Sequence, residues 1–243
     1  LRHLERTIQA EGSDSVAAIL LETIPGTAGV LVPPPGYLAG VREIADHYGI
    51  VFILDEVMAG FARAGEWFAF DAFDVTPDLI TFAKGVNSGY VPLGGVVISD
   101  EIARTFDDRV FPGGLTYSGH PLAAASAVAT IEAMADENIV EHAARMGTDI
   151  LGLRLREIAE RHAVVGEVRG RGVFWAVELV ADRQTREPLG AERMAALKKD
   201  LLDQGLLGFF AENRLHVVPP AVVTESELDR GLTIIDAALG RLG

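Results

Sequence analysis

The sequence of 243 residues contains no cysteine, only three lysines and few aromatic residues. Without cysteine, disulfides and thiolate metal sites are excluded. Aromatic residues make up 7% of the chain, so a core must be built mainly from Ala, Val, Leu and Ile. Basic residues are also fewer than acidic ones, with 21 Lys and Arg against 35 Asp and Glu, so the net charge is -14. Repulsion from phosphate groups argues against nucleic acid and membrane surfaces as partners.

Long apolar runs are absent as well. No stretch approaches the roughly 20 apolar residues that a membrane-spanning helix needs. The first six residues, LRHLER, lack the apolar core of a signal peptide, so we expect a cytoplasmic location. The chain begins with Leu1 rather than Met, inside a stretch that resembles a helix. We therefore expect a piece of a longer protein.

What the sequence does contain is an alternation of apolar runs with helical stretches. Residues 16–22, 51–55, 79–83 and 94–99 have the composition of buried strands, and residues 37–48 and 121–134 that of helices. Near-continuous apolar strands separated by helices predict an α/β fold, with a mainly parallel sheet covered on both faces. We place this larger domain at residues 1–135.

The pattern changes in the second half, which we assign to a smaller α+β domain at residues 136–243. An apolar stripe from Ile139 to Leu153 predicts one long helix that packs on a core. Short strands are expected at residues 164–168, 173–179 and 215–218, and helices at residues 193–204 and 225–239. Thr224 and Glu227 have the spacing of a capping box for the last helix.

Asp55 and Lys84 each end an apolar run, 29 residues apart. Ligands bind beyond the carboxyl ends of strands in open parallel sheets, so an acid and an amine could share one pocket there. Spacing alone leaves two interpretations open, a structural ion pair and a catalytic pair, and structural pairs are the commoner. The six histidines show no metal-ligand spacing, so no metal site is predicted.

Three longer motifs surround these residues. They are ILDEVMAGF at residues 53–61, PDLITFAKG at 77–85 followed by PLGG at 92–95, and GLTYSGHPL at 114–122. In order and spacing they resemble the class III (omega-type) aminotransferases, and the resemblance extends to the C-terminus. It implies the fold of the fold-type I pyridoxal-phosphate enzymes, with pyridoxal 5'-phosphate as cofactor.

The resemblance also implies roles for single residues. Lys84 would form the Schiff base with the cofactor, and burial of such an amine would lower its pKa and favour the neutral nucleophile. Asp55 would face the pyridine nitrogen, and Val57 would pack on the ring. Thr116 would bind the phosphate across a homodimer interface, and Glu22 would lie near the ring. A plainer interpretation stays open for three of these residues. Val57 would be an ordinary core valine, Thr116 part of a helix-capping loop, and Glu22 an acid that faces a loop.

The implied reaction is a ping-pong transfer of an amino group from an amine or amino acid, including an omega-amino acid, to a keto acid. An aminomutase or decarboxylase on the same scaffold, or a non-catalytic remnant, are the alternatives. Ala62 stands where the family usually has Gly, and Phe209 where many relatives have a carboxylate-binding Arg. The family also has a segment before residue 1 with further phosphate contacts, which nothing in this sequence matches.

Overall fold

A computed structural model describes residues 1–242 of the chain. The contacts between residues divide the chain into two compact units. The first comprises residues 1–24, 33–61 and 67–138, and the second comprises residues 25–32, 62–66 and 139–243. Two short segments of the first half therefore pack with the second unit. The division into domains at residues 1–135 and 136–243 stays a prediction.

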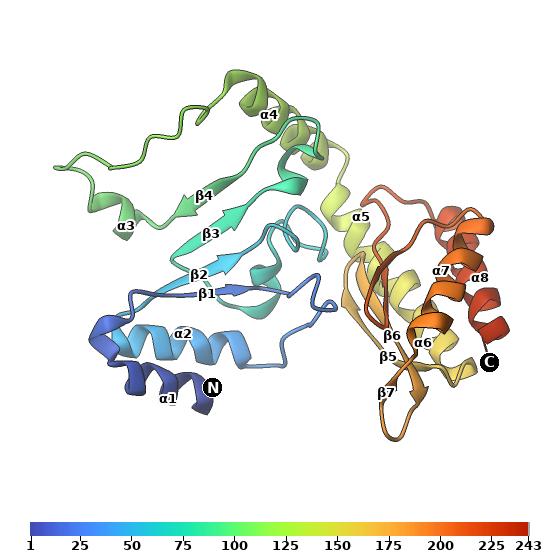
Figure 1. The fold of residues 1–243 in the computed structure, drawn as a ribbon. Helices are drawn as coiled ribbons and strands as arrows, with labels where there is room; N and C mark the ends of the chain where they lie inside the picture. Colours follow the sequence, from blue (N-terminus) through green and yellow to red (C-terminus); the bar gives the residue numbers. More distant parts are fainter. Residues whose placement is uncertain (243) are drawn as a thin grey trace. The chain divides into compact units, whose positions relative to one another are not determined.

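The first unit consists of a small sheet with helices (Figure 1). Its elements are α1 (Arg2–Glu11), η1 (Ser13–Ser15), β1 (Ala18–Glu22), α2 (Tyr37–Tyr48), β2 (Val51–Asp55), η2 (Ala69–Phe73), β3 (Leu79–Phe82), η3 (Lys84–Asn87), β4 (Gly95–Ile98), α3 (Asp100–Arg104) and α4 (Pro121–Asp136).

The strands of this sheet lie in the order β1-β2-β3-β4. β1, β2 and β3 are parallel, whereas β4 pairs antiparallel with β3. All four strands and the helix α2 lie where the apolar runs predicted them. The direction of β4 has no signature in those runs, because an apolar strand has the same composition in either direction.

One face of the sheet carries the core of the unit. Phe52 and Leu54 on β2 are fully buried and pack with Val41 of α2. Because side chains alternate along a strand, the residues between them point to the opposite face. That face is open in the described chain, since Leu20 of β1 is 58% exposed and Ile98 of β4 is 40% exposed.

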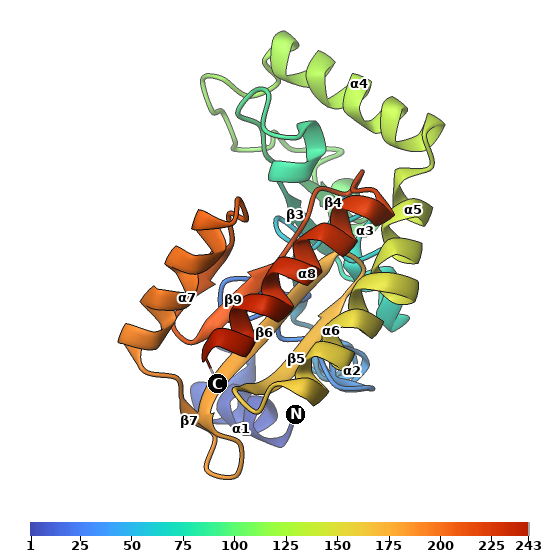
Figure 2. The ribbon, with the colours of Figure 1, turned by 90° about the vertical axis from the view of Figure 1, so that its right-hand side faces the viewer.

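The second unit combines an antiparallel sheet with helices (Figure 2). Its elements are α5 (Ile139–Arg145), the π-helical turn η4 (Met146–Leu151), α6 (Gly152–Arg161), β5 (Val165–Arg171), β6 (Phe174–Asp182), β7 (Glu187–Pro188), α7 (Ala191–Asp203), β8 (Phe209–Ala211), β9 (Arg214–Val217) and α8 (Glu225–Leu242). The capping box is confirmed, since the Thr224 N–H donates to Glu227 Oε2 at 2.8 Å and the Glu227 N–H donates to Thr224 Oγ1 at 3.4 Å. No described helix is long and apolar enough to cross a membrane.

The helical path expected from Ile139 to Leu153 is present and continues to Arg161, but the apolar stripe predicted along it is wrong at its end. The π-helical turn η4 interrupts the α-helical path, and its wider turn shifts the phase of the residues that follow. Leu153 is therefore 51% exposed, whereas Leu151 and Leu155 are fully buried. A spacing rule based on 3.6 residues per turn cannot anticipate such a shift.

A cluster of charges braces the polar face of the second sheet. The Glu178 carboxylate on β6 accepts from Arg169 Nη1 at 2.8 Å and from Arg186 Nη2 at 3.1 Å. Burial raises the pKa of Glu178, but the hydrogen bonds and charges of the two arginines outweigh burial and leave this pKa below the ordinary value. Arg169 also donates to the carbonyl of Gly29, which ties residues 25–32 to the sheet.

We expect Glu178→Gln to lower the free energy of unfolding by about 1–2 kcal/mol at pH 7, because two charge-assisted hydrogen bonds weaken. A carboxyl whose pKa is lower in the folded state stabilises above its unfolded pKa, and that stability is lost as the pH falls through the folded pKa. The difference from wild type should therefore shrink below pH 4.5, the ordinary value. Urea unfolding at pH 7 and at low pH measures the loss of unfolding free energy and its decrease at low pH. The control is Glu187→Gln, at an exposed position. A difference that does not change with pH would contradict the assignment.

Candidate functional site

Three polar side chains form a row across the carboxyl ends of the parallel strands. Glu22 of β1 lies opposite Asp55 of β2, and Asp55 lies opposite Thr81 of β3. Residues paired in a sheet point to the same face, so all three lie on the open face. Lys84 follows Thr81 by three residues and begins η3. Glu22 and Asp55 thus lie side by side at the ends of their strands, and Lys84 lies just beyond the end of β3. That they form one site stays a prediction.

Asp55 is half-buried, and its carboxylate is already oriented. The backbone N–H of Val57 donates to Asp55 Oδ1 at 2.9 Å. This short turn fixes the carboxylate at the strand end by a bond within the same segment. Val57 is half-buried, and its place above a cofactor ring stays a prediction.

Lys84 adopts an uncommon backbone conformation. Its φ of 41° lies in the left-handed region, which costs a non-glycine residue about 1–2 kcal/mol. Such strain often marks functional positions. The side chain is exposed, so the described chain does not provide the burial expected around this amine. The reason is its position just beyond the sheet edge, at the start of a short 3-10 turn.

Thr81 was missed by the sequence reasoning, although strand alternation could have placed it beside Asp55. Its backbone is held in the sheet, where its carbonyl accepts from the backbone N–H of Glu56 at 2.9 Å. Its Oγ1 is buried and has no hydrogen-bond partner in the structure. Buried hydroxyls are nearly always hydrogen-bonded, so this atom calls for an explanation.

Glu56 was also missed, and it supports the row from behind. It follows Asp55 directly, is completely buried and lies in the interior of the unit. Its carboxylate accepts from Thr23 Oγ1 at 2.6 Å, from the Ala69 N–H at 2.9 Å and from the Phe70 N–H at 3.0 Å. Burial raises the pKa of Glu56 above the ordinary value, and the three hydrogen bonds oppose that rise only in part.

Because Thr23 follows Glu22, the bond between Glu56 and Thr23 joins the ends of β1 and β2. The backbone continues this ladder, since the Thr23 N–H donates to the Asp55 carbonyl at 3.3 Å. Glu56 therefore fixes the relative positions of the residues in the row. The signal available in the sequence was a second acid, Glu56, directly after the candidate Asp55 at the end of an apolar run.

Thr116 is not part of the row. It begins a turn in the exposed segment 111–120, just before α4. The helix begins at Pro121, as expected, and His120 caps it through a hydrogen bond from the Leu122 N–H to Nδ1. The phosphate-binding role of Thr116 stays a prediction.

The loop after β2 contains a residue with an uncommon backbone conformation. Ala62 has a φ of 68°, in the region that glycine adopts without strain. That the family usually has Gly at this position stays a prediction. In the same segment Arg63 donates to the Pro219 carbonyl at 2.6 Å, a contact within the second unit.

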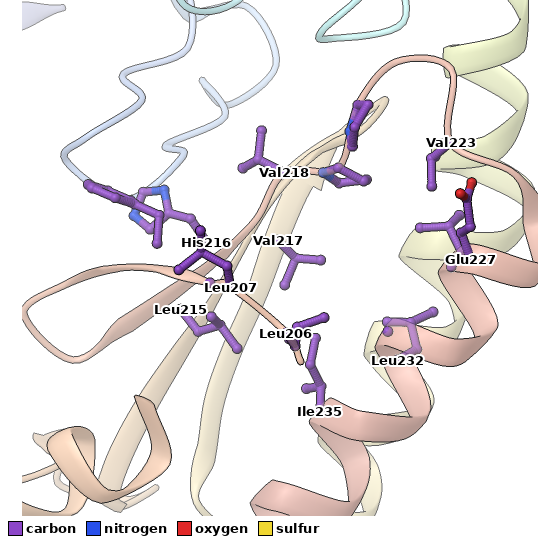
Figure 3. A pocket seen from close by; sticks show the side chains of 16 residues that line it. Leu206, Leu207, Leu215, His216, Val217, Val218, Val223, Glu227, Leu232 and Ile235 are labelled. Carbon is purple, nitrogen blue, oxygen red and sulfur yellow. The ribbon is translucent and has the colours of Figure 1, made fainter. Parts of the chain in front are cut away.

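The second unit contains an apolar groove of about 340 Å³ between α8 and the segment around β9. Figure 3 shows Leu206, Leu232 and Ile235 in its wall. Phe209 also lines it and meets the ring of His216 edge-on, with 5.1 Å between the ring centres. Arg214, the nearest arginine in sequence, forms an ion pair with Glu212 at 2.7 Å. That Phe209 replaces a carboxylate-binding arginine of the relatives stays a prediction.

Comparison with known proteins adds to this geometry. A family model described as aminotransferase class-III matches residues 1–239. The taurine–pyruvate aminotransferase of Rhodobacter capsulatus is 38% identical, over 98% of this chain and 55% of its own length. The putrescine–pyruvate aminotransferase of Pseudomonas aeruginosa is 40% identical, over 95% of this chain and 51% of its own length. The chain thus spans about half the length of the curated relatives it matches.

A solved structure gives the same relationship in three dimensions. The taurine:2-oxoglutarate aminotransferase from Bifidobacterium kashiwanohense, in complex with PLP and glutamate, has a TM-score of 0.95 and 44% identity. The match covers 99% of this chain and 55% of that one. This likeness confirms the expected α/β fold of the fold-type I kind.

We expect Glu56→Ala to lower the free energy of unfolding by about 3 kcal/mol, because it leaves buried donors without an acceptor and opens a cavity. Urea unfolding followed by circular dichroism measures the change. The matched control is Glu43→Ala, an exposed position on α2, with an expected change within about 0.5 kcal/mol. Equal effects of the two substitutions would show that Glu56 does not brace the strand ends.

Proposed function

This chain belongs to the class III aminotransferases, and from this premise we propose that the protein transfers an amino group from an amine or amino acid to a keto acid, with pyridoxal phosphate as cofactor. The observation that carries the proposal is the row Glu22, Asp55 and Thr81, with Lys84 at the same edge of the sheet. Relatives named for taurine or putrescine with pyruvate support a donor with a terminal primary amine, such as an omega-amino acid.

The residues present fit this cofactor. The row offers a half-buried carboxylate and a buried hydroxyl without a partner, and Lys84 adds an amine beyond the strand end. This set of polar groups suits a polar aromatic aldehyde. When bound, the cofactor supplies an electron sink for the carbon that loses its proton. Val57 would lie against the ring, and Thr116 would hold the phosphate.

The reaction itself would depend on two side chains of this chain. Lys84 would hold the cofactor covalently through Nζ, and in the free state its amine would accept and return the substrate proton at the same atom. Asp55 would place a negative charge at the centre of the row, with Oδ1 held by the Val57 N–H. This charge would keep a proton on a ring nitrogen, and Glu22 would lie at the border of the site.

We further propose that the protein is a homodimer. Residues 110–131 expose seven large apolar side chains: Val110, Phe111, Leu115, Tyr117, Leu122, Val128 and Ile131. A helix that is apolar on most sides, as α4 is, normally lies buried. A second copy packed on this region would cover these side chains and carry its own Thr116 to the interface.

A cytoplasmic location completes the proposal, in keeping with a chain that has no cysteine.

Lys84→Ala should abolish borohydride-trapped attachment of pyridoxal phosphate and reduce keto-acid-dependent turnover by at least about 1,000-fold, since a covalent catalyst is lost. The labelled lysine is easy to identify, because the only other lysines of the sequence are Lys198 and Lys199 on α7. Peptide mapping should find the label on Lys84 in the wild type and in the control Lys198→Ala. Label that persists in Lys84→Ala would refute the assignment.

Val128→Asp on α4 should shift the protein from dimer to monomer, because an unpaired charge in a buried interface costs several kcal/mol. Sedimentation velocity at micromolar concentration measures the shift. Leu207→Asp, at an 86% exposed position of the second unit, is the matched control and should leave the dimer intact. A wild-type monomer, or a dimer of Val128→Asp as stable as wild type, would exclude this interface.

A further inference from the structure

The buried hydroxyl of Thr81 has no role in the fold that the structure reveals. Five buried side-chain atoms among the described residues have no hydrogen-bond partner, and Thr81 Oγ1 is the one on the sheet face that bears Asp55. Burying a hydroxyl without a partner costs free energy, so a fold without further use for this atom would be better served by valine.

Neither the backbone nor the side chain can easily turn this hydroxyl elsewhere. The Thr81 backbone is held on both sides, by the bond from the Glu56 N–H at the end of β2 and by its register with Val96 of β4. A β-branched side chain also has few rotamers within a strand. The hydroxyl is therefore held beside Asp55, and none of residues 1–242 is its hydrogen-bond partner.

We propose that Thr81 is a cofactor-positioning residue, whose hydroxyl forms a hydrogen bond with a polar substituent of the pyridine ring bound over the row. This inference rests on the proposed function, since it names a further contact within the same site. The bond would satisfy the buried hydroxyl only when the cofactor is present. Thr81 would thus contribute to cofactor affinity and not to the stability of the apoprotein.

The test compares Thr81→Val, which removes the hydroxyl and keeps the shape, with Thr81→Ser, which keeps the hydroxyl. Each apoprotein is titrated with pyridoxal phosphate by absorbance, and its melting temperature is measured without cofactor. Thr81→Val should weaken binding about 10-fold, because one buried hydrogen bond is lost. Its melting temperature should be unchanged or higher. Thr81→Ser should bind within about twofold of wild type.

Loss of a hydroxyl that stabilises the fold should instead lower the melting temperature of the apoprotein. Thr23→Val is the comparison, because the Thr23 hydroxyl donates to buried Glu56. If Thr81→Val binds the cofactor as tightly as wild type, or melts earlier as Thr23→Val does, the inference is overturned. Its failure differs from failure of the proposed function, in which the wild type itself binds no pyridoxal phosphate.

Discussion

The parallel register of β1, β2 and β3 is the constraint on which the candidate site depends. It sets Glu22 opposite Asp55 and Asp55 opposite Thr81, so three polar groups meet on one face at the carboxyl ends of the strands. A slip of one residue along any strand would turn its polar group to the other face. The apolar alternation opposes such a slip, because it would expose Phe52 and Leu54, which are fully buried.

Asp55 and Glu56 are adjacent in the chain, and their side chains point to opposite faces of the sheet. Asp55 points to the open face, whereas Glu56 points inward and binds Thr23 and the start of η2. The ionised form of a buried carboxyl is costly, and its three donors repay that cost in part. The same hydrogen bonds that stabilise the interior therefore hold the site residues in line, which links stability to the geometry of the site.

The sequence predicted the elements well where a pattern is local. The helix α2, the strand β2 and the capping box at Thr224 follow from alternation, spacing and side-chain chemistry within a few residues. It failed where the outcome depends on distant partners. The π-helical turn moved Leu153 to the surface, and nothing in the apolar run of β4 indicated that this strand pairs antiparallel with β3.

By itself, the sequence determined the family through its three motifs, and it located Asp55 and Lys84 at the ends of apolar strands. Those features are encoded in consecutive residues, where the spacing of side chains decides the local structure. Only the tertiary structure decided that Thr81 stands beside Asp55 with an unpaired hydroxyl, that Glu56 braces the row and that Lys84 is exposed. Pairing and burial depend on strands that are distant along the chain, and no local pattern carries that information.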